Sequence, residues 1–394
     1  MRLLLFNLMT DESDPVLGFA PGWIRELAAR CELIDVITMY RGAYQLPSNV
    51  RVASAGRERG LSKPRRLLNF YRHLLPLLSS RRYDACFAHM MPLFAGLAGP
   101  LLSARGIPTT LWYTHRERSA QLRLGLTMSR RVVSADASSF PYATDKLRVI
   151  GHGIDTDFYA PPPSSKPLPP SLWRASQDEG GGIQVPSSDR ATQTPFPPGG
   201  GRAGDGGDPL VLQVARLAAI KHQATTIQAV AGAEARLALV GGLQPGYPPG
   251  YEARLRRLID QLDLAERCQL LGDLPAVEVR DWYRRATVAV NMSPPGLFDK
   301  AALESMACGV PTVLCNPAFA PLLGEHRELL LTEGPEDIDG LRERLRRLRA
   351  LPAAERAEIG GALRENVLRQ HGRPQLIERL LAVLATGELP PPIP

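Results

Sequence analysis

The chain has 394 residues, which is enough for two domains that each bury a hydrophobic core. Hydrophobic residues make up 44% and charged residues 22%, as in globular proteins, and the longest apolar run, near 90–102, is too short to span a bilayer. The five cysteines form no CxxC pair, which predicts reduced thiols in a cytoplasmic protein and argues against a disulfide framework or zinc site. The first nine residues are too short an apolar segment for a signal peptide, so we expect them to form a strand.

The net charge of +7 is unevenly distributed along the chain. Residues 1–160 contain 21 Lys and Arg against 13 Asp and Glu, so the basic excess belongs to the N-terminal half. This imbalance indicates an anionic surface or partner for that half. Nucleic acid is disfavoured, because the basic residues do not form a recognisable nucleic-acid-reading module.

A strand, a helix and a second strand are predicted at the start of the chain, at 2–8, 23–30 and 33–38. This order begins a doubly wound α/β domain with a parallel sheet. The loop after the first strand contains Gly18, which is either a residue of a surface turn or part of a loop that faces a ligand cleft. Further strands are expected at 50–53, 84–88, 108–113, 131–135 and 147–150.

Two histidines follow predicted strands of this domain. His89 comes directly after strand 84–88, and His115 comes after strand 108–113. Ligands of open parallel sheets bind beyond the carboxyl ends of the strands, so both are candidate site residues. The alternative for each is a structural or solvent-exposed histidine. Arg116 and Arg118, beside His115, either contact an acceptor or are solvated.

Residues 57–82 mix basic side chains with leucines and aromatic residues. A basic amphipathic helix of this kind can lie on anionic lipid headgroups. The alternative is a core helix with a solvated basic face. Residues 161–209 are different in composition, since Pro, Gly and Ser dominate and apolar residues are sparse. They are predicted to be a disordered linker between two domains, because such a composition cannot form a packed core.

The C-terminal half repeats the alternation of strands and helices. Strands are predicted at 210–214, 235–240, 268–271, 287–292 and 310–314. Helices are predicted at 254–262, 279–286, 297–308, 338–351, 353–370 and 376–384, and a short strand near 331. A second doubly wound domain therefore follows the linker.

The segment 292–314 is the most informative part of the sequence. It reads as a strand end, a Pro- and Gly-containing loop, a helix at 297–308 with Asp299 in its first turn, a Gly stop and a buried strand. A helix that opens at the end of a strand favours an anion such as a diphosphate at its N-terminus. Lys300 and Glu304 are spaced to lie on one helix face. On these features alone, a buried crossover helix with one surface ion pair is an equal alternative.

The run Glu304-Ser305-Met306-Ala307-Cys308-Gly309-Val310-Pro311 resembles the donor-site signature of retaining glycosyltransferases of family 4, also called glycosyl transferases group 1. Gly296 stands eight residues before Glu304, where that signature has another Glu, and the segment is similar to a Gly-x-x-Asp-Lys variant of it. Arg216 and Lys221 keep the spacing of the family's Gly-Arg-Leu-x-x-x-Lys-Gly motif. The turns at 151–158 and 272–275 also resemble motifs of this family.

The resemblance implies a GT-B architecture, in which two doubly wound Rossmann-like domains face a cleft. The expected division is an acceptor-side domain at 1–160, the linker at 161–209, a donor domain at 210–370, and a helix crossing back with the tail at 371–394. The implied reaction moves a sugar from a nucleotide diphosphate sugar to an acceptor hydroxyl with retention of anomeric configuration. Its expected setting is the synthesis of cell-surface polysaccharide, glycolipid or glycoconjugate.

The resemblance also assigns roles to residues. Arg216, Lys221 and the start of the 297–308 helix would stabilise the diphosphate without a metal or other cofactor, and Glu304 would accept hydrogen bonds from the ribose. The implied catalytic residues are His115, Asp299 and Lys300. The implied donor-binding residues are Arg216, Lys221, Glu304, Gly242, Leu274, Gly296, Leu297 and Phe298. Gly18 and His89 are assigned to the acceptor side or the cleft loop.

Two other functions stay open from the sequence. One is a catalytically weak GT-B protein that acts as a nucleotide-binding or membrane-associated partner. The other is a GT-B sugar-nucleotide epimerase, which needs no acceptor. The sequence leaves the base open between UDP and GDP, and it leaves the acceptor open, with a saccharide or a lipid-linked molecule as the expected class. Peripheral contact with the inner face of the membrane through 57–82 is the expectation that accompanies a lipid-linked acceptor.

Overall fold

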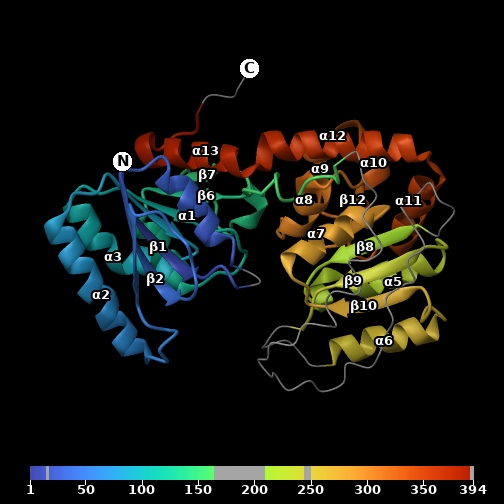
Figure 1. The fold of residues 1–394 in the computed structure, drawn as a ribbon, viewed down its shortest axis with the longest axis horizontal. Helices are drawn as coiled ribbons and strands as arrows, with labels where there is room; N and C mark the ends of the chain where they lie inside the picture. The colour runs from blue at the N-terminus through green and yellow to red at the C-terminus, as the bar shows by residue number, and fades with distance from the viewer. Residues whose placement is uncertain (15–16, 164–208, 244–249, 391–394) are drawn as a thin grey trace.

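The computed structural model describes residues 1–14, 17–163, 209–243 and 250–390 (Figure 1). Most of the predicted linker at 161–209 therefore lies outside the described residues. The described chain forms two parallel sheets with helices packed on their faces. This arrangement confirms the predicted α/β fold with two Rossmann-like domains.

The first sheet has seven parallel strands in the order β3-β2-β1-β4-β5-β6-β7. Leu3, Leu4 and Phe6 of β1, an interior strand, are fully buried, as expected for a parallel strand that is covered by helices on both faces. The strands are β1 (Arg2–Thr10), β2 (Leu33–Arg41), β3 (Val50–Ser54), β4 (Ala85–His89), β5 (Thr109–Trp112), β6 (Arg131–Ser134) and β7 (Leu147–Val149).

The second sheet has five parallel strands in the order β10-β9-β8-β11-β12. The strands are β8 (Leu210–Val214), β9 (Arg236–Val240), β10 (Cys268–Gly272), β11 (Val288–Asn291) and β12 (Thr312–Leu314). The strand predicted near Leu331 is wrong, because Leu331 forms a single bridge with Leu314 and no continuous strand.

Thirteen α-helices belong to the described part of the chain, besides short 3-10 turns. They are α1 (Ala20–Ala28), α2 (Lys63–Ser80), α3 (Pro92–Ala104), α4 (Ala120–Met128), α5 (Gln223–Ala231), α6 (Tyr251–Gln261), α7 (Ala276–Arg285), α8 (Lys300–Ala307), α9 (Ala320–Leu323), α10 (Arg327–Leu330), α11 (Ile338–Ala350), α12 (Ala353–His371) and α13 (Arg373–Thr386). None of these helices is both long and apolar enough to cross a bilayer.

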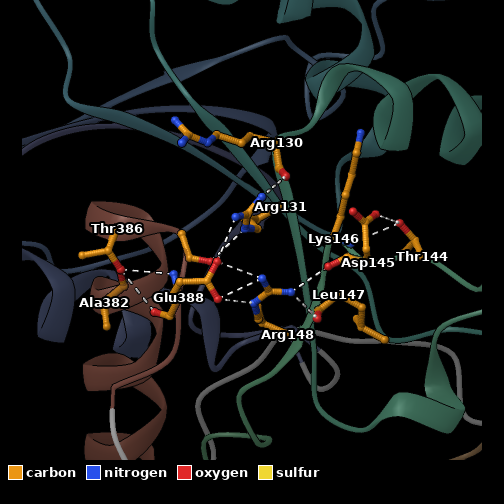
Figure 2. A network of polar contacts seen from close by, with 11 residues as sticks. Arg130, Arg131, Thr144, Asp145, Lys146, Leu147, Arg148, Ala382, Thr386 and Glu388 are labelled. Carbon is orange, nitrogen blue, oxygen red and sulfur yellow. Dashed lines mark hydrogen bonds and ion pairs between the residues drawn. The ribbon is translucent and has the colours of Figure 1, made fainter.

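The last two helices run along both domains. In Figure 1, α12 lies along the second domain and α13 lies along the first, where it packs against α1 and β4. The chain crosses at a short backbone pairing, in which the Ile154 N–H donates to the His371 carbonyl at 2.7 Å and the Arg373 N–H donates to the Ile154 carbonyl at 2.9 Å. Arg373 also forms ion pairs with Glu26 and Asp155. Glu388, after α13, is bound by two arginines of the first sheet (Figure 2).

Candidate functional site

The order of the strands in each sheet indicates where the candidate site lies. In the first sheet the order in which strands are added reverses between β1 and β4, and in the second sheet it reverses between β8 and β11, although all strands are parallel. Ligands of open parallel sheets bind at such reversal points, beyond the carboxyl ends of the strands. The segments that follow β8 and β11 contain Lys221 and Asp299, and those at β1 and β4 contain Gly18 and His89.

Lys221 and Asp299 form an ion pair beyond the carboxyl ends of β8 and β11 in the second sheet. The Lys221 ammonium donates to both Asp299 oxygens, at 2.8 Å to Oδ1 and 2.6 Å to Oδ2, and to Ser293 Oγ at 3.1 Å. Asp299 Oδ2 also accepts from Asn291 Nδ2 at 3.1 Å and from the Ser293 hydroxyl. The Lys221 side chain is 9% exposed. Lys221, which was predicted to stabilise the diphosphate, and Asp299, which was predicted to be a catalytic residue, therefore bind each other.

The helix that follows this pair begins later than predicted. It starts at Lys300 instead of Leu297, and Asp299 occupies the position before its first turn without capping it. The prediction was wrong because the Asp299 carboxylate is bound by Lys221. Leu297 lies in the loop, where its carbonyl accepts from Asn316 Nδ2 at 3.1 Å. Phe298 is also in the loop, and its ring stacks on Phe319 with 4.1 Å between ring centres.

Lys300 and Glu304 lie on one face of α8, with 3.9 Å between Nζ and Oε1, as the spacing predicted. Burial raises the pKa of the Glu304 carboxyl, while the Lys300 charge and a hydrogen bond from Tyr159 oppose this rise. Burial likewise lowers the pKa of Lys300, and the Glu304 charge opposes the shift. The Glu304 carboxyl is thus shielded from water and lies beside a hydrogen-bond donor, Tyr159, and a cation, Lys300.

Lys300 also joins the two domains. Its ammonium lies 4.1 Å from the centre of the Phe19 ring, which comes from the segment before α1. His89 is packed nearby against Trp23, with 5.0 Å between ring centres. Burial lowers the pKa of His89 to about 3, with further contributions from the charges of Lys300 and His152. His89 is therefore a neutral, buried side chain where the two domains meet, and Nε2 has no hydrogen-bond partner among the described residues.

The other predicted residues of the first domain lie in loops. The Gly18 N–H donates to the Asp14 carbonyl at 3.0 Å, and a Cβ on Gly18 would lie 2.5 Å from that oxygen. Glycine is thus required by the tight turn before α1. His115 is exposed, and its Nδ1 accepts from the Glu117 N–H at 3.3 Å. In the described chain, this hydrogen bond ties His115 to its own loop and to none of the other predicted site residues.

Arg216, Gly242 and Leu274 follow the carboxyl ends of β8, β9 and β10. The half-buried Arg216 accepts, through its carbonyl, a hydrogen bond from Gln223 Nε2 at 2.9 Å. The Gly242 N–H donates to Asp273 Oδ1 at 2.7 Å. Leu274 is partly buried and packs on the same apolar cluster as Tyr159. These three residues border the same edge of the second sheet as Lys221.

Several residues of the site were not predicted. Asn291 is the last residue of β11 and Ser293 comes two residues later, so their position at a strand end was a signal that could have identified them. Tyr159 and Phe19 reach the site from other parts of the fold, and no local spacing indicates them. Among the described residues, no group of three or more His, Cys, Asp or Glu side chains is arranged to hold a metal ion.

Residues 202–364 match the family described as Glycosyl transferases group 1, so this part of the chain is similar to that family. A D-inositol 3-phosphate glycosyltransferase of Xylanimonas cellulosilytica is 25% identical over 268 residues, which is 67% of this chain and 55% of the relative. D-inositol 3-phosphate glycosyltransferase 1 of Catenulispora acidiphila is 32% identical over 136 residues, which is 33% of this chain and 31% of that protein. The matched region spans about half or less of the length of these relatives.

Two solved structures have a similar fold over nearly the whole chain. Anabaena Alr3699/HepE in complex with UDP and glucose has a TM-score of 0.70 and 16% identity, with 98% of this chain and 100% of that chain covered. Sucrose-phosphate synthase from Thermosynechococcus elongatus has a TM-score of 0.67 and 18% identity, with 96% and 98% covered. The protein therefore has the GT-B fold that was expected, with two parallel-sheet, Rossmann-like domains.

Proposed function

We propose that this protein transfers a sugar from a nucleotide diphosphate sugar to an acceptor hydroxyl, with retention of anomeric configuration. The observation that carries the proposal is the array Lys221, Asp299, Lys300 and Glu304 at the reversal point of the second sheet. The match of residues 202–364 to Glycosyl transferases group 1 supports this assignment. We propose the synthesis of a cell-surface polysaccharide, glycolipid or glycoconjugate in the cytoplasm as its setting.

The chemistry requires positive potential where the diphosphate leaves. Arg216, Lys300 and the N-terminus of α8 would supply it, because preorganised cations and helix N–H groups stabilise developing negative charge. The buried Lys221 would act mainly by fixing Asp299 and the loop before α8. Glu304, whose pKa is raised by burial, would accept hydrogen bonds from the ribose hydroxyls. This arrangement would need no metal.

The roles proposed for the first domain follow from its position across from α8. His115 is exposed on the loop after β5, so its imidazole would be available to orient the sugar. Gly18 shapes the turn before α1, and Phe19 contacts Lys300 at 4.1 Å. The acceptor would enter between these loops and the donor site.

A second proposal concerns the membrane. The outer face of α2 carries Leu68, which is 69% exposed, and Leu75, which is 48% exposed, two helical turns apart. Exposed Arg65 and Arg72 lie on the same stripe at helical spacing. We propose that this face touches anionic lipid headgroups and thereby brings the protein to a lipid-linked acceptor.

The first experiment measures thermal stabilisation of the purified protein by UDP, GDP, ADP and their sugar conjugates. A ligand at about 100 times its dissociation constant should stabilise the protein by roughly 2.7 kcal/mol. Arg216→Ala should weaken nucleotide diphosphate binding by roughly 1.5–3 kcal/mol, the range for hydrogen bonds to charged groups. Arg254→Ala, an exposed change on α6, is the control and should leave binding unchanged.

The outcomes separate the proposed function from its two alternatives. Unchanged binding in Arg216→Ala would remove Arg216 from the site. Stabilisation without turnover of any nucleotide sugar would favour a binding protein. Conversion of the nucleotide sugar in the absence of an acceptor, with the diphosphate retained, would favour an epimerase. Transfer requires release of the nucleoside diphosphate that depends on an added acceptor.

A further inference from the structure

The loop between β11 and α8 contains a turn with no side chain at its tip. The Leu297 N–H donates to the Pro294 carbonyl at 3.1 Å, which closes a turn over Pro294-Pro295-Gly296-Leu297. Gly296 has a φ of +92°, the left-handed value that glycine adopts at the third position of a type II turn after proline. The local sequence Pro-Pro-Gly therefore explains this backbone without reference to any ligand.

The space beside Gly296 is filled by Arg116 of the first domain. A Cβ on Gly296 would lie 2.6 Å from Arg116 Nη1 and would overlap Cδ of the same side chain. Arg116 thus lies flat against the turn that precedes α8. The glycine is required twice, once by its φ and once by this contact across the domains.

The loop that carries Arg116 is held in place at both ends. The Tyr113 hydroxyl donates to the Glu117 carbonyl at 3.1 Å, and the Ser119 hydroxyl caps α4 by accepting from the Leu122 N–H at 3.1 Å. Arg118, two residues after Arg116, stacks instead over Tyr142, with 5.5 Å from its guanidinium carbon to the ring centre. Two arginines of one loop therefore have different surroundings, and only Arg116 is known to face the Gly296 turn.

The charges around the Gly296 turn leave Arg116 without an acidic partner. Asp299, three residues later, is bound by Lys221 at 2.6 Å, and Glu304 has Lys300 at 3.9 Å and the Tyr159 hydroxyl. Within the part of the chain that the structure describes, no ion pair includes Arg116. Arg116 is exposed and lies against the Gly296 turn. A guanidinium in such a position beside a substrate site gains most from a carboxylate, because the two planar groups can form two parallel hydrogen bonds.

We propose that the donor sugar carries a carboxylate, as in a nucleotide diphosphate uronic acid, and that the Arg116 guanidinium binds this group. The inference rests on the proposed function. The second domain holds Arg216 and the α8 N-terminus, which would take the nucleotide and its phosphates. Arg116 comes from the opposite domain, so it meets the donor at its sugar end. Arg116 is then the residue that determines the class of donor sugar.

The test compares dissociation constants by calorimetry in the full-length chain. The probes are UDP, UDP-glucose and UDP-glucuronate, with GDP, GDP-mannose and GDP-mannuronate as the parallel set. The variants are Arg116→Met, which keeps the apolar stem and removes the charge, and Arg118→Met as the matched control from the same loop. The natural protein should bind the uronate conjugate of its preferred base about 10- to 100-fold more tightly than the neutral conjugate, as expected for a charged hydrogen-bonded pair.

Arg116→Met should abolish this preference while the affinity for the nucleoside diphosphate stays within about twofold, and Arg118→Met should retain the preference. Equal affinities for the two conjugates in the natural protein would overturn the inference. A preference that survives in Arg116→Met would overturn it as well, as would an equal loss of affinity for UDP and both conjugates, which would make Arg116 a phosphate ligand. Failure of every nucleotide to bind would instead overturn the proposed function.

Discussion

At the residue scale, the Lys221 ammonium makes all of its hydrogen bonds to oxygen atoms of the protein itself. Its three N–H groups meet Asp299 and Ser293, and its side chain is largely buried. Removing one member of a buried ion pair costs about 3–5 kcal/mol, because the other charge stays buried without compensation. We therefore predict that Lys221→Met lowers the free energy of unfolding by about 3 kcal/mol even without ligand, measured by urea denaturation.

A double-mutant cycle checks the origin of this loss. Lys221→Met with Asp299→Asn should destabilise the protein by clearly less than the two single changes combined, because no unpaired charge remains. The exposed pair of Arg256 and Glu252 on α6 is the control, since such surface pairs contribute about 0.2–1 kcal/mol. Additive effects, or single changes that cost less than about 1 kcal/mol, would show that Lys221 is held by something other than Asp299.

The same residues explain how far the sequence could predict the site. Arg216, Lys221 and Glu304 were identified because their spacing resembles motifs near the ends of strands. The bond between Lys221 and Asp299 joins positions 78 residues apart, and no local pattern reports it. Arg116 and Tyr159 come from outside the second sheet, so their contacts depend on how the two domains pack. Sequence spacing therefore indicates which edge of a sheet forms the site, and tertiary packing decides which side chains meet there.

At the element scale, strands were predicted better than helices. Parallel strands covered on both faces are short continuous apolar runs, and the predicted 210–214 coincides with β8. The helices α3 and α4 were not predicted. The α3 segment is largely apolar along its whole length, so it lacks the amphipathic period on which helix prediction depends. The start of α8 was misplaced, since Asp299, which was expected in the first turn of the helix, precedes it and is bound by a distant lysine.

The exposed face of α2 leads to a prediction about membrane binding. The double change Leu68→Gln with Leu75→Gln should weaken binding to phosphatidylglycerol vesicles at least about tenfold, since burying a leucine contributes about 1.5–3 kcal/mol. Co-sedimentation with vesicles measures this. Val277→Gln on α7, which is 51% exposed, is the matched control and should have no effect. Equal binding of the double variant and the natural protein, or equal binding to phosphatidylcholine vesicles, would contradict a docking role for α2.

At the scale of the whole molecule, the crossing of the chain ends in an ion-pair cluster. Arg148 donates to both oxygens of Glu388 at 2.9 and 3.0 Å, and Arg131 donates to Oε1 at 2.9 Å (Figure 2). Arg131 also donates to the Gly387 carbonyl at 2.8 Å, directly after α13. The end of α13 is therefore bonded to β6 and β7. Its start is held by the ion pairs of Arg373 with Glu26 and Asp155. Both ends of α13 are thus attached to the first domain, while α12, which precedes it, lies along the second.

The cluster sets the pH range in which this attachment holds. Hydrogen bonds from Arg148 and Arg131 lower the pKa of Glu388 to about 2 from an ordinary value of 4.5. A carboxyl whose pKa is lowered in the folded state stabilises that state above its unfolded pKa, and the contribution is lost as the pH falls toward the folded pKa. The attachment should thus persist at neutral pH and disappear only between about pH 4.5 and 2.

We predict that NMR titration of the Glu388 carboxylate gives a midpoint near 2, and that Arg148→Met raises this midpoint toward 4.5 because the larger hydrogen-bond contribution is removed. Amide exchange in the last turn of α13 should become faster in Glu388→Gln, while the central strands of both sheets stay protected, because the change releases only one end of a helix. Salt near 1 M should speed exchange in the natural protein and leave Glu388→Gln unaffected, since exposed ion pairs are screened. A midpoint near 4.5 in the natural protein, or unchanged exchange in Glu388→Gln, would show that α13 is held on the first domain by its apolar contacts alone.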